Sequence, residues 1–155
     1  MNGWRLPWRA ACLCGAVKME ATAPPVLSCA CHCRDCQKLT GGAYSLTLIL
    51  PVAAFRVTEG APVIGGLHRP ELRHHFCPSC LNWLYTKPAA MPDFVNLRAT
   101  MLDDASWVVP FIDTMSAEKL RGAVSGASRS YTGWPPPEDF APLTAAYAAS
   151  GARPG

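Results

Sequence analysis

The sequence lacks a long hydrophobic run and is poor in charge. No apolar stretch approaches the roughly 20 residues that a membrane-spanning helix needs, and the opening MNGWRLPWRAACLCG has neither the apolar block nor the small-residue cleavage site of a signal peptide. Only 16% of the residues are charged and 50% are hydrophobic, which excludes an intrinsically disordered chain. We therefore expect a folded cytoplasmic protein without a membrane partner.

Three common catalytic motifs are also missing, together with any internal repeat. The chain has no G-x-x-x-x-G-K phosphate-binding loop, no H-E-x-x-H zinc-binding helix and no G-x-S-x-G nucleophile turn. Its 155 residues suit one domain that folds without disulfides. We expect this single zinc-binding domain to span 1–155, with a core at about 10–145 and a frayed tail at 150–155.

Short apolar alternations predict a mostly β fold built from antiparallel sheets. The predicted strands are 16–22, 43–51, 55–60, 62–67, 71–77, 82–87 and 93–102. The CPSC sequence between two of these strands is typical of a zinc ribbon. Short helices are expected only near the C-terminus, at 116–124 and 138–150, the second broken or begun at Pro142.

Cysteine is abundant: the chain has eight, in three groups plus Cys29. The groups are Cys12 and Cys14 (C-x-C), then Cys31, Cys33 and Cys36 (C-x-C-x-x-C), then Cys77 and Cys80 (C-x-x-C). In a reducing compartment such spacing is typical of metal ligation or redox chemistry rather than of disulfides. We therefore expect zinc.

The spacing allows two ways of sharing the sulfurs between metal sites. A structural zinc takes four protein ligands, whereas a catalytic zinc takes three and keeps one position open. Joining the first and third groups makes a closed four-thiolate site and leaves the middle group with a vacancy. The rival division joins Cys33 and Cys36 to the third group and leaves the other four for a second site. Under either division, the cysteines could also hold zinc ions that are only structural and take no part in catalysis.

The formal net charge of +3 hints at a nucleic-acid partner. Seven thiolates on two Zn²⁺ ions would change that charge by −3, because the thiolates add −7 and the ions +4. The net positive charge would then be zero. The basic residues are also scattered rather than clustered, which argues against a nucleic-acid partner.

Three segments resemble the glutathione-dependent formaldehyde-activating enzyme family, which includes the centromere-protein-V-like proteins. They are CLCGAV at 12–17, CHCRDCQ at 31–37 with TGGAYS soon after, and FCPSC at 76–80. The resemblance implies a tent-like antiparallel β fold, a structural zinc on Cys12, Cys14, Cys77 and Cys80, and a second, labile, catalytic zinc on Cys31, Cys33 and Cys36. It also implies glutathione as the partner and a carbon–sulfur lyase activity that forms S-hydroxymethylglutathione from formaldehyde.

The chain departs from the family pattern at three places. The glycine common after the C-x-x-C is replaced by Leu81, the late KLPW element appears as KLRG at 119–122, and Cys29 is additional. The first two change the surroundings of the pocket, and therefore the substrate, without touching a metal ligand.

A zinc ion with an open position can bind a thiolate or polarise a carbonyl, and both suit the addition of a thiol to an aldehyde. Three thiolates leave Zn²⁺ with a net charge of −1, so cations are expected nearby. Arg34 and Lys38 could offset this charge or bind a substrate carboxylate, and the alternative is that both are solvated surface charges. Gln37 is expected to hydrogen-bond a bound ligand or a thiolate.

Other side chains near the middle group have plainer interpretations. His32 would point away from the metal if its segment is extended, which favours a packing role. Cys29 could close the vacancy, but we favour a small buried apolar residue. The alternative to an enzyme is a non-enzymatic zinc-binding module for protein or nucleic acid. A third possible function is a redox relay between the middle cysteines and Cys29.

Overall fold

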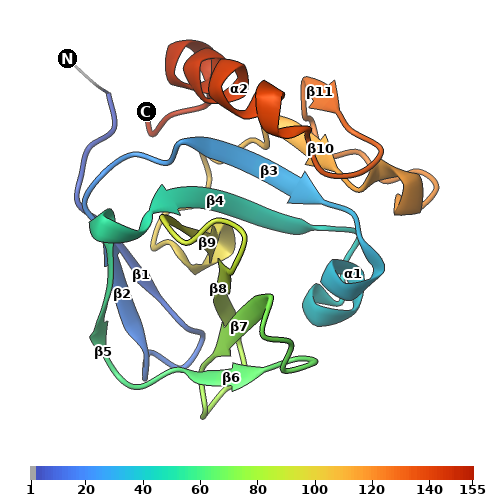
Figure 1. Ribbon diagram of the computed structural model, residues 1–155. Helices are drawn as coiled ribbons and strands as arrows, with labels where there is room; N and C mark the ends of the chain where they lie inside the picture. The colour runs from blue at the N-terminus through green and yellow to red at the C-terminus, as the bar shows by residue number, and fades with distance from the viewer. Residues whose placement is uncertain (1–2) are drawn as a thin grey trace.

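The computed structural model describes residues 3–155 and shows a mostly β protein with two sheets (Figure 1). The smaller sheet has the strand order β1-β2-β5, formed by Trp8–Ala11, Lys18–Ala21 and Phe55–Glu59. The larger has the order β11-β10-β3-β4-β9-β8-β7-β6, formed by Arg129–Ser130, Ile112–Thr114, Leu27–Cys31, Ser45–Pro51, Phe94–Arg98, Trp83–Pro88, Leu72–Phe76 and Val63–Gly65. The predicted mostly β class is confirmed.

Strand pairing is antiparallel except around β10. That strand lies parallel to both β3 and β11, so the large sheet is mixed at one edge. Parallel neighbours need a long crossover connection, and here the chain leaves β9 near the middle of the sheet and returns beside β3. The Asp113 position of β10 thereby comes to lie next to Ala30, just before the middle cysteine group.

Some local predictions differ from the structure. The strand predicted at 93–102 ends at Arg98, where a 3-10 turn at Ala99–Met101 bends the chain. In the segment 116–124 only Ser116–Glu118 is helical, as one 3-10 turn, because the backbone becomes extended at Lys119. Helix α2 (Pro137–Ser150) is continuous through Pro142 rather than broken or begun there.

Helix α1 (Arg34–Thr40) is an element that the sequence patterns did not predict. Cys33 caps its N-terminus by accepting a hydrogen bond from the Cys36 N–H, and Gly41 ends it in the left-handed region with φ of 64°. Glycine adopts that conformation without the steric cost of a Cβ. The short helix therefore places two of the middle cysteines within a single turn.

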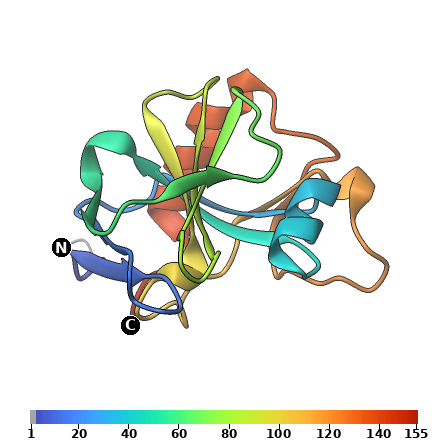
Figure 2. The same cartoon turned by 90° about the horizontal axis from the view of Figure 1, so that it is seen from below.

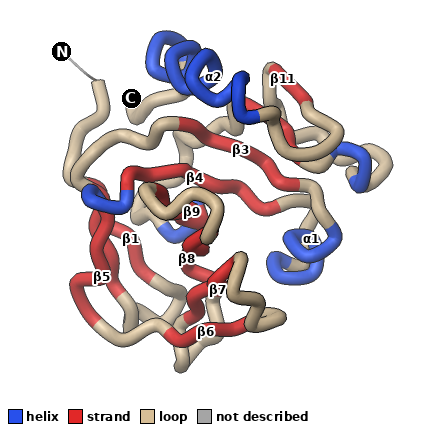
Figure 3. The backbone as a smooth tube through the Cα atoms, in the orientation of Figure 1, coloured by secondary structure: helices blue, strands red, loops and turns tan. Residues whose placement is uncertain are grey.

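The core lies between the two sheets and under α2, which covers β3 in Figure 3. An aromatic cluster joins the N-terminal segment to α2: the rings of Trp8 and Trp107 are 4.9 Å apart, and those of Trp4 and Tyr147 are 6.1 Å apart. Aromatic side chains bury 150–250 Å² each, so this cluster is a major source of stability. Within the described residues, no helix is both long and apolar enough to cross a bilayer.

The two cysteine-rich regions lie in different parts of the fold. Cys12 and Cys14 are in the β1–β2 connection, and Cys77 and Cys80 are in the β7–β8 turn. The middle group lies where β3 leads into α1. In Figure 2, α1 and the segment between β10 and β11 lie together on the side of the molecule away from the chain ends.

Candidate metal centres and the cavity beside them

The four-cysteine group has the geometry of a tetrahedral zinc site. The Sγ atoms of Cys12, Cys14, Cys77 and Cys80 all lie within 4.8 Å of one another. The Cys12–Cys14 and Cys14–Cys77 separations are 3.6 Å and 3.7 Å. Sulfurs about 2.3 Å from a zinc ion would be about 3.8 Å apart at the corners of a tetrahedron. The donor set fits zinc without rearrangement.

Backbone amides support negative charge on these sulfurs. The Val17 N–H lies 3.3 Å from Cys12 Sγ, and the N–H groups of Asn82 and Cys14 lower the pKa of Cys80 to about 6. Hydrogen bonds to a thiolate favour its ionised form. The two loops are also joined directly, because Leu13 N–H donates to Asn82 Oδ1 at 2.7 Å. This closed group ties the small sheet to the far end of the large one, as a structural site would.

The three-cysteine group forms where a strand meets a helix. The Sγ atoms of Cys31, Cys33 and Cys36 lie within 4.8 Å of one another, and no fourth Cys, His, Asp or Glu of residues 3–155 joins them. Hydrogen bonds from the thiols of Cys33 and Cys36 lower the pKa of Cys31 to about 2. The Ser45 hydroxyl donates to Cys36 Sγ at 3.1 Å and orients it. The group can hold a metal and leave a position open.

The observed grouping is the one that the family resemblance implied. Cys33 and Cys36 lie in a separate cluster from Cys77 and Cys80, so the rival division does not occur in this fold. Cys29 belongs to neither cluster. It is 2% exposed, and burial raises the pKa of its thiol to about 12.

His32 faces away from the sulfurs, as the alternation of an extended segment predicted. It is fully buried, and its Nε2 lies 2.9 Å from Asp113 Oδ1 on β10. Asp113 also accepts hydrogen bonds from Lys119 Nζ at 3.0 Å and from Ser125 Oγ at 2.6 Å. This network holds the end of β3, and therefore the first sulfur of the trio, against β10.

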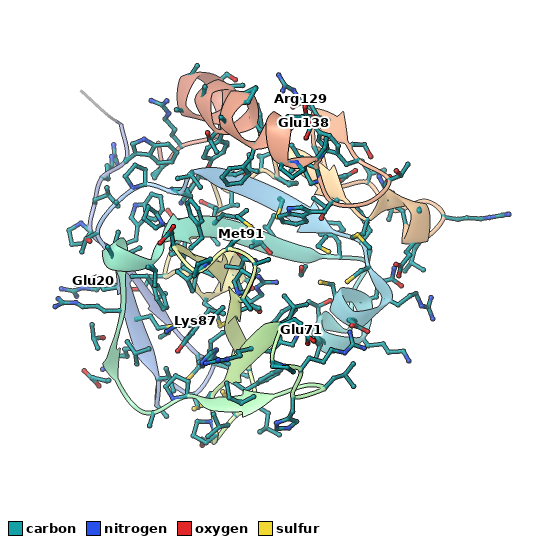
Figure 4. All side chains as sticks on the ribbon, viewed as in Figure 1. Glu20, Glu71, Lys87, Met91, Arg129 and Glu138 are labelled. Atoms are coloured by element: carbon teal, nitrogen blue, oxygen red, sulfur yellow. The ribbon has the colours of Figure 1, made fainter. Side chains whose placement is uncertain are left out.

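A cavity of about 500 Å³ opens beside the three-cysteine group. This volume is within the range of small-molecule sites. All three cysteines of the group line it, with polar side chains from β4, β8 and β9 and apolar ones from the surrounding loops. Met91, labelled in Figure 4, is one of the apolar wall residues and belongs to the connection between β8 and β9. A smaller cavity of about 260 Å³ adjoins it and shares four lining residues with it, Asp35, Leu39, Leu72 and His74.

A sequence profile described as "Glutathione-dependent formaldehyde-activating enzyme" matches residues 7–117. The chain belongs to this family. The matched region includes all eight cysteines and therefore both sulfur clusters. A comparison with curated proteins gives no match.

A crystal structure of a Rhodobacter sphaeroides protein resembles this family member at the level of the fold. It has 16% sequence identity and a TM-score of 0.52, and the alignment covers 79% of this chain and 99% of that one. At this identity the likeness supports the architecture alone.

The three predicted substrate contacts of this family member lie in different settings. Arg34 is exposed and lines the large cavity, whereas Lys38 is exposed and lines the smaller one. Gln37 is buried, and its Nε2 donates to the carbonyl oxygens of His32 at 2.7 Å and Glu118 at 2.9 Å. The Gln37 carboxamide therefore joins α1 to the β10–β11 segment.

Arg98 is a cavity residue that the sequence patterns did not single out. It is 6% exposed at the end of β9, and its guanidinium carbon lies 4.1 Å from the centre of the Trp83 ring. The available signal was a charged residue in the middle of the predicted strand 93–102. A buried arginine in a sheet is uncommon unless it is paired.

Proposed function

We propose that this protein is a zinc-dependent enzyme of the carbon–sulfur lyase type that joins a small thiol to an aldehyde, as in the formation of S-hydroxymethylglutathione. The observation that carries the proposal is the three-thiolate group, which has no fourth ligand among residues 3–155 and faces a cavity of about 500 Å³. Membership of the glutathione-dependent formaldehyde-activating enzyme family supports the same reaction class.

Cys31, Cys33 and Cys36 would hold the catalytic zinc, which when bound supplies a position for the thiol sulfur and a Lewis acid for the aldehyde oxygen. The chain prepares these ligands in two ways. Ser45 fixes the orientation of Cys36, and the N-cap hydrogen bond fixes that of Cys33. Cys12, Cys14, Cys77 and Cys80 would hold a structural zinc away from the chemistry.

Substrate contacts are proposed for residues around α1. Arg34 lies at the large cavity and can reach an anionic part of a glutathione-like thiol, and Lys38 offers a second cation at the adjoining cavity. Gln37 would act by keeping α1 in place through its two backbone contacts, and its remaining oxygen lies 3.5 Å from Arg34 Nη1. A cytoplasmic location suits eight cysteines that are all free thiols.

The test is turnover of formaldehyde and glutathione by zinc-loaded protein. We expect the wild type to accelerate formation of the hemithioacetal, followed by exchange NMR with ¹³C-labelled formaldehyde, and Cys33→Ser to lose at least about 100-fold of that acceleration. Cys29→Ala removes a sulfur outside both clusters and should retain the zinc content of the wild type. Wild-type protein with two bound zinc ions and no rate above the uncatalysed reaction would refute the proposed activity and favour a binding module.

A further inference from the structure

The guanidinium of Arg98 is buried in the wall of the large cavity without a carboxylate partner. Five ion pairs occur among residues 3–155, and none involves Arg98. Its recorded hydrogen bond runs from Nη2 to the Asn96 carbonyl oxygen at 3.1 Å. Buried charges in proteins are generally paired, and no carboxylate of residues 3–155 pairs with this arginine.

Two polar side-chain atoms at the same place on β9 lack hydrogen-bond partners. Arg98 Nε and Asn96 Oδ1 are both buried without a partner in the part of the chain that the structure describes. The two residues are two positions apart on one strand and both line the cavity. Unpartnered buried polar atoms are few in native proteins and tend to mark sites where a ligand or water completes the set.

The guanidinium is also held in a fixed orientation. Its carbon lies 4.1 Å from the centre of the Trp83 ring, which is a stabilising cation–π distance. Burial lowers the pKa of Arg98, and negative charge on the nearby sulfurs of the three-cysteine group opposes that change. Arginine remains charged in proteins, so the cavity contains a fixed cation near the sulfur trio.

Apolar side chains form much of the remaining cavity wall, together with the charged Arg34, Asp35 and Glu118. Leu39, Met91, Met115 and Trp134 line it beside Trp83. Met115 has a φ of 56°, in the left-handed region that long side chains rarely adopt. Hydrogen bonds from Met115 N–H to the Gly133 oxygen at 2.9 Å and from Glu118 N–H to the Met115 oxygen at 3.1 Å hold this conformation. Such conformations gather at ligand sites.

We propose that Arg98 binds a carboxylate of the ligand and that the cavity takes a thiol with an apolar body and one carboxylate. The planar guanidinium presents paired N–H donors that match a carboxylate, and the apolar walls would cover the chain between carboxylate and sulfur. The inference rests on the proposed function in one respect: the sulfur of the ligand lies at the three-cysteine group. The proposed ligand carries a single carboxylate, whereas glutathione carries several charged groups.

The test compares two thiols that differ only in one end group, 6-mercaptohexanoate and 6-mercaptohexanol. Their dissociation constants are measured by calorimetry on zinc-loaded protein, so no turnover is needed. We expect the wild type to bind the acid about 10-fold more tightly than the alcohol, as charge-assisted hydrogen bonds in a dry site would give. Arg98→Met should abolish this preference and still bind the alcohol.

Controls separate the possible failures. Arg56→Met removes an exposed arginine of the small sheet and should keep the preference of the wild type. Arg98→Lys keeps the charge but loses the planar fork, and it should show a preference below about 3-fold. An equal preference in wild type and Arg98→Lys would overturn the inference, and so would loss of one zinc equivalent from Arg98→Met, because Arg98 would then serve the metal. If the zinc-loaded wild type binds neither thiol, the result contradicts the proposed function, because no thiol then binds at the three-cysteine group.

Discussion

Leu81 shows how one residue of this chain carries backbone strain. It follows Cys80 in the β7–β8 turn, where its φ is 59° and its side chain is 70% exposed. The turn needs this conformation, because the Leu81 N–H donates to the Cys77 oxygen at 3.0 Å. A left-handed conformation costs roughly 1–2 kcal/mol for a residue with a Cβ. Glycine would adopt this conformation without that cost, so the leucine gives up stability at the edge of the four-cysteine group.

Leu81→Gly should therefore stabilise the zinc-loaded protein. The relief of left-handed strain exceeds the extra entropy of glycine in the unfolded chain, for a net gain of about 0.5 kcal/mol in the free energy of unfolding. Chemical denaturation with zinc present measures the change. Leu13→Gly is the matched control, since Leu13 is equally apolar, 86% exposed and next to the same sulfurs but has no positive φ. If both variants lose stability alike, strain at Leu81 is not the cause.

At the same scale, the sequence pointed to the cysteine clusters but not to the buried cation. Cysteines at C-x-C and C-x-x-C spacing point to metal or redox sites, and the two clusters in the structure contain the same cysteines as the two groups that the family resemblance implied. Arg98 gave no comparable signal. Its importance depends on Trp83 and Asn96 and on the absence of a carboxylate, and only the packing of β8 against β9 shows these.

At the scale of elements, the strand β10 positions the three-cysteine group through Asp113. This carboxylate is 4% exposed and contacts His32, Lys119 and Ser125. Burial raises its pKa, but the hydrogen bonds from Ser125, His32 and Lys119 outweigh that effect, and the pKa lies below the usual 3.8. Its charged form is therefore favoured in the folded protein.

Asp113→Asn should destabilise the protein by about 1–3 kcal/mol, because it removes the charge at the centre of a buried network and replaces one of its two acceptor oxygens with an N–H donor. A depressed folded-state pKa contributes stability above the unfolded value, and this is lost as the pH falls through the folded value. The gap between wild type and variant should be constant from about pH 7 to 5 and shrink below about 3.8. Denaturant unfolding across this range measures it.

The exposed Asp103→Asn is the control and should change stability by less than about 0.5 kcal/mol. A gap that widens on acidification would contradict the ionised role of Asp113.

Strands with alternation or with clear flanking signals could be predicted, and elements defined by tertiary contacts could not. Strand β2 alternates in burial, β4 is an apolar run that ends at Pro51, and β7 and β8 flank the CPSC sequence. Strand β3 is buried at four of its five residues, so its sequence LSCAC has no alternation to detect. Helix α1 has only seven residues and is capped by a thiol rather than by a hydroxyl or carboxylate. Its helical form depends on the sulfur group and on the contact of Gln37 with Glu118.

At the scale of the whole molecule, the proposed function assigns a different task to each sulfur cluster. The four-cysteine group joins the β1–β2 connection to the β7–β8 turn, two segments more than 60 residues apart, as the Cys14–Cys77 contact shows. A metal there contributes directly to folding free energy. The three-cysteine group is local to β3 and α1, so the fold closes without a metal at that place and the site can stay open to ligand.

The most direct measurement of this division is zinc content beside thermal unfolding for wild type, Cys33→Ser and Cys77→Ser. We expect the wild type to hold two zinc ions, one of them removed by mild chelation. Cys33→Ser should hold one ion and remain folded, whereas Cys77→Ser should unfold or aggregate. A wild type that holds a single ion with the three thiols of the middle group free to react, or two variants that unfold alike, would contradict the account.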